Sequence, residues 1–218
     1  MKDIKVLHVP CYYKKSILDI LKKNFSVLGE YRKVGLISTA QHLDQLDSLK
    51  EFIESSKKKA VVGGQILGCS QENALKIDGE IDAYVYIGSG LFHPIGLSVK
   101  TKKPVYILNP YSGSLSLLDD SGRERWLKRQ KGRLVRAMQA DSYGILISTK
   151  SGQFNLKKAF DVRKKFSDRK VFLFAGEELN PNNVLPFKVD CWINTACPRL
   201  VDDSFEKPVV NADELDLL

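Results

Sequence analysis

An internal repeat is the feature of this 218-residue sequence that most restricts its fold. Three short segments of the first half recur in the same order, at a nearly constant offset, in the second half. The matching pairs are 35–39 with 145–149, 82–85 with 190–193, and 103–105 with 207–209. We therefore expect two similar domains, residues 1–110 and 111–218, which meet at the turn-forming segment Asn109–Gly113.

Each half alternates apolar, β-rich segments with helical patterns. The expected strands are 4–9, 34–39, 60–62, 83–87 and 105–108 in the first unit, and 115–118, 144–148, 171–175 and 189–194 in the second. The clearest helical patterns are 14–23, 42–54, 123–140 and 155–166. Strands that are apolar on both faces and joined by crossover helices are typical of parallel sheets covered on both sides. The expected fold class is α/β, with two similar parallel-sheet αβα domains related by the repeat.

The composition excludes a disordered or membrane-spanning chain. It has 34 Lys and Arg against 26 Asp and Glu, a net charge of +8, and 43% hydrophobic residues, which is usual for a globular protein. No apolar run approaches the ~20 residues that a bilayer span needs. We expect a cytoplasmic protein with no membrane partner.

A basic segment, 123–136, accounts for most of the excess charge. Leu127, Leu134 and Met138 recur at helical spacing, which predicts that they share one side of a helix with the charges on the others. Two interpretations stay open, a solvated helix face and a surface for an acidic macromolecule. No motif with stacking aromatic residues accompanies the segment, so we expect no direct nucleic-acid partner.

Four scattered cysteines include no CxxC pair, which excludes zinc ribbons and thioredoxin-type motifs. Cys69 and Cys197 lie in Gly- or Pro-flanked loops after strands, where metal or thiolate chemistry is favoured over a core role. Cys11 follows Pro10 at an expected strand end and is a weaker candidate. Cys191 lies within a strand and is expected to be a buried apolar residue.

Nearly all polar or reactive residues of interest follow strands. Parallel α/β sheets bind ligands at the carboxyl ends of their strands, so we expect a site there, in a cleft between the two units. His93 is either a general acid or base or a structural loop residue, and His42 at a helix start is expected to be structural. The glycine-rich turns match no phosphate-binding spacing.

Six ordered motifs together resemble the diphthamide synthesis radical enzymes, the 2-(3-amino-3-carboxypropyl)histidine synthases of archaea and eukaryotes. The motifs are 39–42, 64–69, 87–94, 109–111, 148–153 and 194–200, followed by Asp202 and Asp203. The resemblance extends from about residue 5 to the C-terminus. It implies a short form of the family that lacks the N-terminal domain, with units that resemble the family's second and third domains.

The resemblance implies an unusual radical chemistry. Three cysteines of the family hold a 4Fe-4S cluster that binds and cleaves S-adenosylmethionine, and the aminocarboxypropyl group is transferred to a histidine of translation elongation factor 2, the first step of diphthamide synthesis. Cys69 and Cys197 match the second and third cluster ligands. The domain with the first ligand is missing, so Cys11 replaces it, a partner chain supplies it, or the cluster is different or absent. We favour Cys11.

The family motifs also assign a cosubstrate site. Gln65, Ser89, Gln153 and Arg199 are expected to contact S-adenosylmethionine or the target histidine, and His93 is the candidate catalytic residue for proton transfer. The resemblance further implies a homodimer or a heterodimer with a homologue, and an electron donor. The alternative functions are a noncatalytic or electron-relay subunit that pairs with a complete homologue, and a related transferase with another target.

Overall fold

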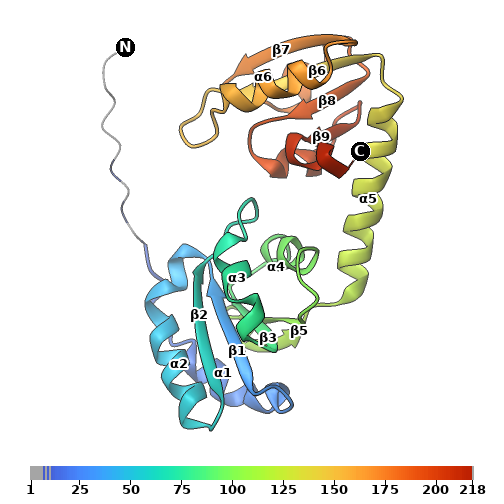
Figure 1. Cartoon of the computed structure of the whole chain (residues 1–218). Coiled ribbons are helices and arrows are strands. Elements are labelled where there is room, and N and C mark those ends of the chain that lie inside the picture. The colour runs from blue at the N-terminus through green and yellow to red at the C-terminus, as the bar shows by residue number, and fades with distance from the viewer. Residues whose placement is uncertain (1–6, 8, 10, 218) are drawn as a thin grey trace. The chain divides into compact units, whose positions relative to one another are not determined.

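The computed structural model describes residues 7, 9 and 11–217 and contains two compact units, Met1–Arg123 and Glu124–Leu218. The division falls within the long helix α5 (Asp120–Met138), coloured yellow in Figure 1. The expected boundary at 110/111 lies earlier in the chain. The expected strand 4–9 lies for the most part outside the described residues.

The first unit contains a five-stranded sheet in the order β2-β1-β3-β4-β5. Its strands are β1 (Lys33–Ser38), β2 (Lys59–Gln65), β3 (Ala83–Ile87), β4 (Val105–Asn109) and β5 (Ser114–Leu117). Its helices are α1 (Leu18–Asn24), α2 (Leu46–Ser55), α3 (Glu72–Lys76) and α4 (Phe92–Ser98), with the 3₁₀ helices η1 (Phe25–Leu28), η2 (Ala40–Gln45) and η3 (Asp78–Glu80).

Two apolar clusters cover the faces of this sheet. Leu21 of α1 and Leu49 and Ile53 of α2 pack on one face, and Ala74 of α3 and Leu97 of α4 pack on the other. Residues Ala83 to Ile87 of β3 are all buried, because the sheet is covered on both sides. The first unit is thus a three-layered αβα sandwich (Figure 1).

The second unit contains a four-stranded parallel sheet in the order β7-β6-β8-β9. Its strands are β6 (Ser142–Ser148), β7 (Lys170–Gly176), β8 (Cys191–Asn194) and β9 (Val209–Asn211). Helix α6 (Leu156–Lys165) packs with α5 on one face. The other face carries α7 (Pro181–Val184) and the 3₁₀ helix η4 (Pro198–Asp202), and the 3₁₀ helix η5 (Ala212–Leu217) follows β9.

The repeat corresponds to the same strand order in both units. Asp82 lies at the start of β3, and its carboxylate accepts hydrogen bonds from the backbone N–H groups of Arg32 (3.0 Å) and Lys33 (2.8 Å). Asp190, its counterpart before β8, accepts from the backbone N–H of Ser142 (2.9 Å) and from its hydroxyl (2.6 Å). These hydrogen bonds lower the pKa of both carboxyl groups and join equivalent parallel strands.

Two sequence predictions differ from the structure. The strand expected at 115–118 in the second unit is β5, which pairs antiparallel with β4 in the first sheet. The turn at Pro110–Gly113 is too short for the crossover that a parallel strand needs, so the chain folds back as a hairpin. Strand β9, which the sequence analysis missed, follows the repeated Lys-Pro-Val motif that also leads into β4.

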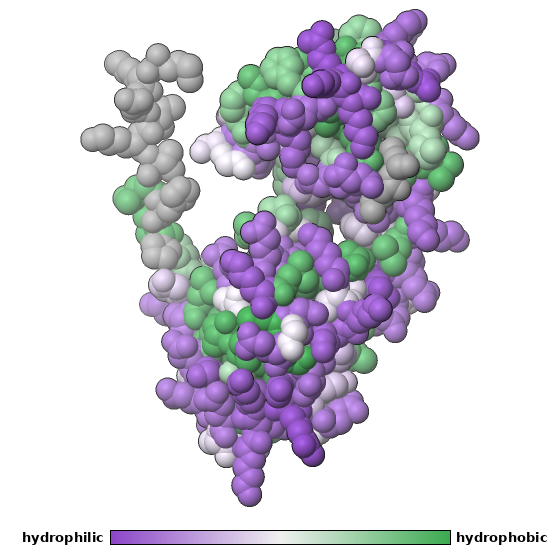
Figure 2. Space-filling view, viewed as in Figure 1, coloured by the Kyte–Doolittle hydropathy of each residue, from purple (hydrophilic) through white to green (hydrophobic). Residues whose placement is uncertain are grey.

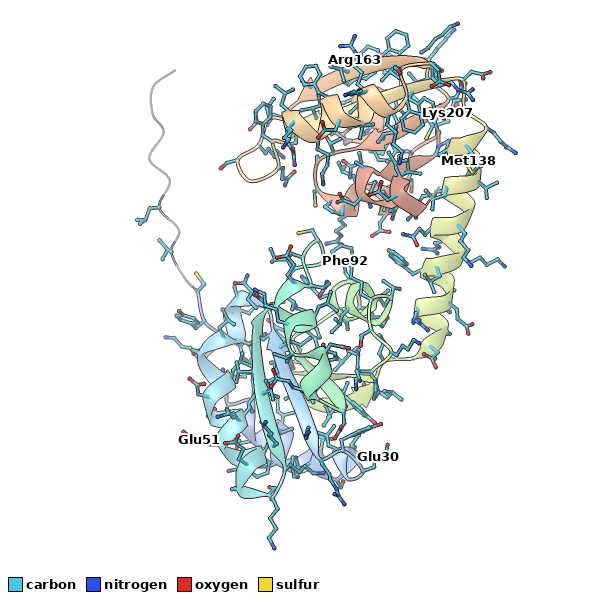
Figure 3. The ribbon with its side chains drawn as sticks, viewed as in Figure 1. Glu30, Glu51, Phe92, Met138, Arg163 and Lys207 are labelled. Atoms are coloured by element: carbon cyan, nitrogen blue, oxygen red, sulfur yellow. The ribbon has the colours of Figure 1, made fainter. Side chains whose placement is uncertain are left out.

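Helix α5 is basic as predicted, but its faces differ from the prediction. Leu134 is buried, whereas Met138 is 59% exposed (Figure 3). Arg133, which was counted among the surface charges, is 8% exposed because its guanidinium pairs with the buried carboxylate of Glu214 at 3.6 Å. Hydrophilic side chains cover much of the visible face of the molecule in Figure 2. None of the helices in the described part of the chain is long and apolar enough to cross a membrane.

A glycine in β6 makes room for the largest side chain of the second core. Gly144 lies opposite Trp192 of β8, and a Cβ atom at Gly144 would come within 2.2 Å of the indole ring. Gly144→Ala is expected to lower the free energy of unfolding by about 1–3 kcal/mol, because the crowded ring must leave its packed position. Urea unfolding followed by tryptophan fluorescence measures this change.

Gly132→Ala is the matched control. Gly132 lies within α5, and a Cβ atom there would meet nothing within 4 Å. Alanine is the better helix former, so this variant is expected to gain about 0.5–1 kcal/mol. Unchanged stability of Gly144→Ala would contradict the packing described for Trp192.

Candidate functional site

The strands of the first unit end side by side at one edge. In the register of the sheet, Ser38 at the end of β1 pairs with Gln65 of β2 and with Ile87 of β3, and Ile87 pairs with Leu108 of β4. The loops that follow these strands therefore start at a common edge, as the sequence predicted. Gln65 is the last residue of β2, Cys69 and Ser89 lie in the loops after β2 and β3, and His93 follows in the first turn of α4.

Cys69 lies at the tip of a tight turn after β2. Leu67 and Ser70 exchange two backbone hydrogen bonds, of 2.9 and 3.1 Å, which leave Gly68 and Cys69 as the turn residues. Gln71 is 1% exposed, and its side-chain amide donates to the Leu67 carbonyl oxygen at 2.7 Å. Gln71 thus supports the turn from its buried side, whereas Cys69 itself is exposed.

Phe92 covers the other side of this turn. A Cβ atom at residue 68 would lie 1.7 Å from the Phe92 ring, so only glycine allows this contact. Figure 3 shows Phe92 at the edge of the first unit where the strands end. The packing joins two of the motifs that the sequence analysis singled out, the loop after β2 and the loop after β3.

His93 lies in the first turn of α4 and is half-buried. Its ring stacks on Tyr86, with the ring centres 5.9 Å apart and the planes inclined by 16°. The Tyr86 hydroxyl donates to the backbone carbonyl oxygen of the exposed Ser89 at 3.5 Å, and burial raises the pKa of Tyr86 to about 12. The phenol therefore stays neutral and forms a wall behind Ser89 and His93.

Cys11 is exposed and precedes the helices of the first unit. Two residues later, the Tyr13 N–H donates to the Gln41 carbonyl oxygen at 2.8 Å, and the Tyr13 ring contacts His42 at 5.2 Å between ring centres. Gln41 follows the end of β1. Because two residues of chain span at most ~7 Å, Cys11 lies near the strand-end edge that carries Cys69.

The second unit has a cavity of about 220 Å³ at the carboxyl ends of its strands. It brings together three predicted residues, Gln153 after β6 and Cys197 and Arg199 after β8. The remaining lining residues are Ser148, Lys150, Glu177, Leu179, Leu200 and Asp203. The loops after β6, β7 and β8 thus form one site within this unit.

The lining of this cavity combines opposite charges. Lys150 and Arg199 supply cations, and Glu177 and Asp203 supply carboxylates. Such a set suits a zwitterion with an amino group and a carboxylate, for which the guanidinium fork is a favourable partner. The volume is below the ~300–1,000 Å³ of pockets for drug-sized ligands, so the cavity suits an amino-acid group.

Sequence reasoning included Lys150 and Asp203 in the family motifs without giving them a role, and it did not single out Glu177 or the supporting Gln71. Glu177 follows directly after β7, so the rule that singled out the other strand ends also applies to it. Gln71 carries no such signal, because its role depends on burial under a turn.

The cysteines divide as the sequence analysis expected. Cys191 is fully buried in the core of the second unit, and burial raises the pKa of its thiol to about 12. Cys197 is half-buried in the cavity wall, and Cys69 and Cys11 are exposed. Cys69 follows β2, whereas Cys197 follows β8, the counterpart of β3, so the two thiols do not occupy equivalent positions of the repeat.

Thiolates are suitable ligands for an iron–sulfur cluster, and the loops leave Cys69 and Cys197 accessible. Across residues 7, 9 and 11–217, no three His, Cys, Asp or Glu side chains are grouped so as to hold a metal ion. Cys69 belongs to the first unit and Cys197 to the second, so only the chemistry of their thiols, and no assembled ligand group, suits a cluster.

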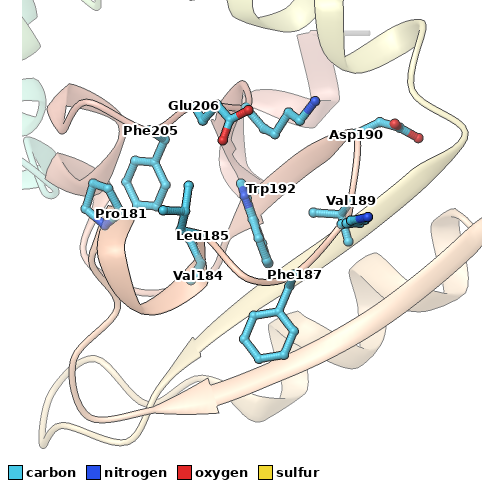
Figure 4. Close-up of a pocket in the computed structure, with 11 residues that line it drawn as sticks. Pro181, Val184, Leu185, Phe187, Val189, Asp190, Trp192, Phe205 and Glu206 are labelled. Atoms are coloured by element: carbon cyan, nitrogen blue, oxygen red, sulfur yellow. The ribbon is translucent and has the colours of Figure 1, made fainter.

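A separate cavity of about 380 Å³ lies at the amino ends of β8 and β9 (Figure 4). Trp192, Phe205 and Phe187 contribute aromatic walls, and Glu206 also lines the cavity. None of the predicted site residues lines this cavity, and parallel sheets bind their ligands at the opposite, carboxyl ends.

The molecule is thus a double α/β protein with accessible thiols and a charged cavity at its strand ends. The model of the family described as "Putative diphthamide synthesis protein" matches residues 1–218. The chain belongs to this diphthamide synthesis family, as the sequence resemblance predicted.

Named relatives resemble this chain at moderate identity. The chain is 33% identical to the 2-(3-amino-3-carboxypropyl)histidine synthase of Pyrococcus horikoshii, over 99% of this chain and 66% of the relative. It is 27% identical to subunit 1 of the human enzyme, over 98% of this chain and 51% of that subunit. The crystal structure of Dph2 from Pyrococcus horikoshii with a 4Fe-4S cluster superimposes with a TM-score of 0.85 at 30% identity, over 94% of this chain and 63% of that chain. The chain thus spans less than two thirds of these relatives.

His42 is buried at the same edge as Cys69, in η2 after β1. Both ring nitrogens lack a hydrogen-bond partner, and burial lowers the pKa of His42 below its ordinary value of 6.5, although Asp44 acts in the opposite direction. The neutral ring is therefore the folded form, which agrees with the structural role that the sequence analysis expected.

The lowered pKa of His42 predicts a pH-dependent stability. The unfolded chain binds a proton at His42 as the pH falls through about 6.5, while the folded chain does so only at lower pH. The free energy of unfolding should therefore fall between pH 7.5 and pH 5.5, and His42→Gln should reduce this slope. Equal slopes in His42→Gln and the wild type, measured by urea unfolding, would contradict the assignment.

Proposed function

We propose that this chain is an aminocarboxypropyl transferase of diphthamide synthesis, which uses a 4Fe-4S cluster and S-adenosylmethionine to modify a histidine of translation elongation factor 2. The observation that carries the proposal is the cavity after β6, β7 and β8, where Cys197 adjoins a cation and carboxylate set suited to an amino-acid group. The match to Dph2 with its 4Fe-4S cluster supports it.

The residues divide into cluster ligands and cosubstrate contacts. Cys69 and Cys197 would hold the cluster, together with Cys11, whose anchoring through Tyr13 to the end of β1 supports the choice. When bound, the reduced cluster supplies the electron that cleaves S-adenosylmethionine. Cys191 is excluded because it is enclosed in the core.

Arg199, Gln153 and Glu177 would orient the methionine part of the cosubstrate. Arg199 would pair with its carboxylate, Glu177 with its amino group, and Gln153 would donate or accept a hydrogen bond. In the first unit, Gln65 and Ser89 would supply further polar contacts. His93, held against Tyr86 with its ring half-buried, would accept or donate the proton at the target imidazole.

The second candidate function is a noncatalytic or electron-relay subunit that pairs with a complete homologue. The observation in its favour is that neither unit has three cysteines of its own, since Cys11 and Cys69 belong to the first and Cys197 and the buried Cys191 to the second. In that case a partner chain would supply the missing ligand. A homodimer, an external electron donor and a cytoplasmic location belong to the first proposal as expected partners and setting.

Iron binding separates the two functions. The purified, anaerobically reconstituted protein is expected to contain about four irons per chain and to give an electron paramagnetic resonance signal after reduction. Cys69→Ala, Cys197→Ala and Cys11→Ala should each lose or alter the signal, because each removes a thiolate ligand. Iron and sulfide analysis with the reduced-state spectrum measures this.

Cys191→Ala is the matched control, since its thiol is buried in the core. It should bind iron like the wild type. An unchanged spectrum in Cys11→Ala alone would remove Cys11 from the ligand set. Little iron in every protein, restored by addition of a full-length homologue, would favour the subunit function.

Arg199 provides a test of the cosubstrate site. Arg199→Ala is expected to weaken S-adenosylmethionine binding by about 10- to 100-fold, since a charge-assisted hydrogen bond contributes ~1.5–3 kcal/mol. Isothermal titration calorimetry measures the dissociation constant. Arg163→Ala changes a charge on α6 outside this cavity and should leave it unaltered. Equal affinity of Arg199→Ala and the wild type would exclude Arg199 from the site.

A further inference from the structure

A network of hydrogen-bonded, buried side chains supports the loop that carries Cys197. Asn194, the last residue of β8, is 2% exposed. Its amide donates to the Cys197 carbonyl oxygen at 2.8 Å, and its own carbonyl oxygen accepts from the Ala196 N–H at 2.9 Å. The Asn194 side chain thus hydrogen-bonds to the loop backbone at both Ala196 and Cys197.

Asn211, the last residue of β9, is the next member of the network. Its side-chain oxygen accepts from the Asn194 amide at 2.8 Å, and its own amide donates to the Pro198 carbonyl oxygen at 3.2 Å. Ala196 and Cys197 are therefore tied to Asn194 of β8, and Pro198, which follows Cys197, is tied to Asn211 of β9. Asn211 is 8% exposed, so water does not replace these bonds readily.

Glu214 anchors the far end. One carboxylate oxygen accepts from the Asn211 N–H at 3.2 Å, and the other accepts from the Gln130 amide at 3.1 Å. The Arg133 guanidinium lies 3.6 Å from the same carboxylate. Asn211, Glu214, Gln130 and Arg133 are each less than 10% exposed.

Burial makes this hydrogen-bond network sensitive to the loss of any of its side chains. A buried carboxylate needs a cation and hydrogen-bond donors, and a buried amide without a partner is costly. Arg133 has no hydrogen-bond partner for its Nε or for the amino group that faces Glu214, so it depends on Glu214 for charge compensation. Loss of one member therefore leaves its buried partners without a hydrogen bond or a countercharge.

In the described part of the first unit the counterpart residues are arranged differently. Asn109 at the end of β4 is the counterpart of Asn211, and its side-chain oxygen accepts from the N–H groups of Tyr111 (2.9 Å) and Ser112 (3.4 Å) in its own turn. The loop after β3, the counterpart of the Cys197 loop, has Ser89 and no cysteine. The network is present in the second unit, where the loop after β8, the counterpart of β3, carries a thiol.

We propose that Asn194, Asn211 and Glu214 are positioning residues that set the Cys197 thiol in the wall of the charged cavity, with Gln130 and Arg133 as their supports on α5. The positioning of the thiol follows from this structure, and its use for a cluster rests on the proposed function. Loss of a member should release the loop, so that the half-buried Cys197 becomes more accessible.

Thiol alkylation of the full, metal-free chain tests the proposal. The rate of iodoacetamide labelling is measured for each cysteine by peptide mass spectrometry in the wild type, Asn211→Ala and Glu214→Gln. Labelling of Cys197 should become about tenfold faster in both variants, while labelling of the exposed Cys69 in the first unit stays unchanged. Asp213→Asn is the matched control, because Asp213 adjoins Glu214 but its side chain is 71% exposed and pairs only at the surface with Lys158.

Cys191 distinguishes local release from unfolding, since it lies in the core of the same unit. Faster labelling confined to Cys197, with Cys191 still protected, supports the positioning role. Joint acceleration of Cys191 and Cys197, or an unchanged Cys197 rate in both variants, overturns it. Glu214→Gln keeps the side-chain volume and decides the question if Asn211→Ala unfolds.

Iron reconstitution of the same proteins separates this proposal from the function. If the wild type binds no iron but Cys197 is labelled selectively faster in Asn211→Ala, the positioning role is supported and the proposed cluster is contradicted. If all proteins assemble the same cluster and label at the same rate, the positioning fails and the function stands. The joint expectation is an intact cluster in the wild type and an altered reduced-state spectrum in Asn211→Ala.

Discussion

Parallel pairing on both sides of a central strand is the constraint on which the rest of the molecule depends. β1 lies between β2 and β3, and β6 lies between β7 and β8. Because the strands of each set run in one direction, the loops that follow them start at one edge. The cavity of the second unit is lined by three such loops. In the first unit, the Cys69 turn packs between residues of the loops after β2 and β3. Both features follow from this alignment.

The two units use the same edge for different chemistry. In the first, Phe92 and Gln71 hold a rigid turn that presents the Cys69 thiol to solvent. In the second, the loops enclose a charged cavity with Cys197 in its wall. The common strand order provides two similar frameworks, and the side chains after each strand decide what each framework binds. Family membership and the match to Dph2 agree with this arrangement.

Several features could be predicted because their signals are local. The strands 83–87 and 105–108 are continuous apolar runs, and β3 and β4 were found close to their true bounds. Cys191 could be assigned to the core from its place within a strand. The pairing of β5 was assigned wrongly because the repeat placed the domain boundary in the turn before it, although a turn that short favours a hairpin with β4. Met138 matched the helical spacing but is exposed, whereas its neighbour Ala137 is the residue that packs in the core.

The sequence by itself determined the repeat, the α/β class, and which loops carry thiols, because these depend on the order and period of residues along the chain. Only the tertiary structure decided that Glu214 binds Arg133 and Gln130, that Asn211 reaches the Cys197 loop, and that Gln71 lies under the Cys69 turn. These contacts join residues from different elements, and a buried polar group finds its partner only when packing has excluded water.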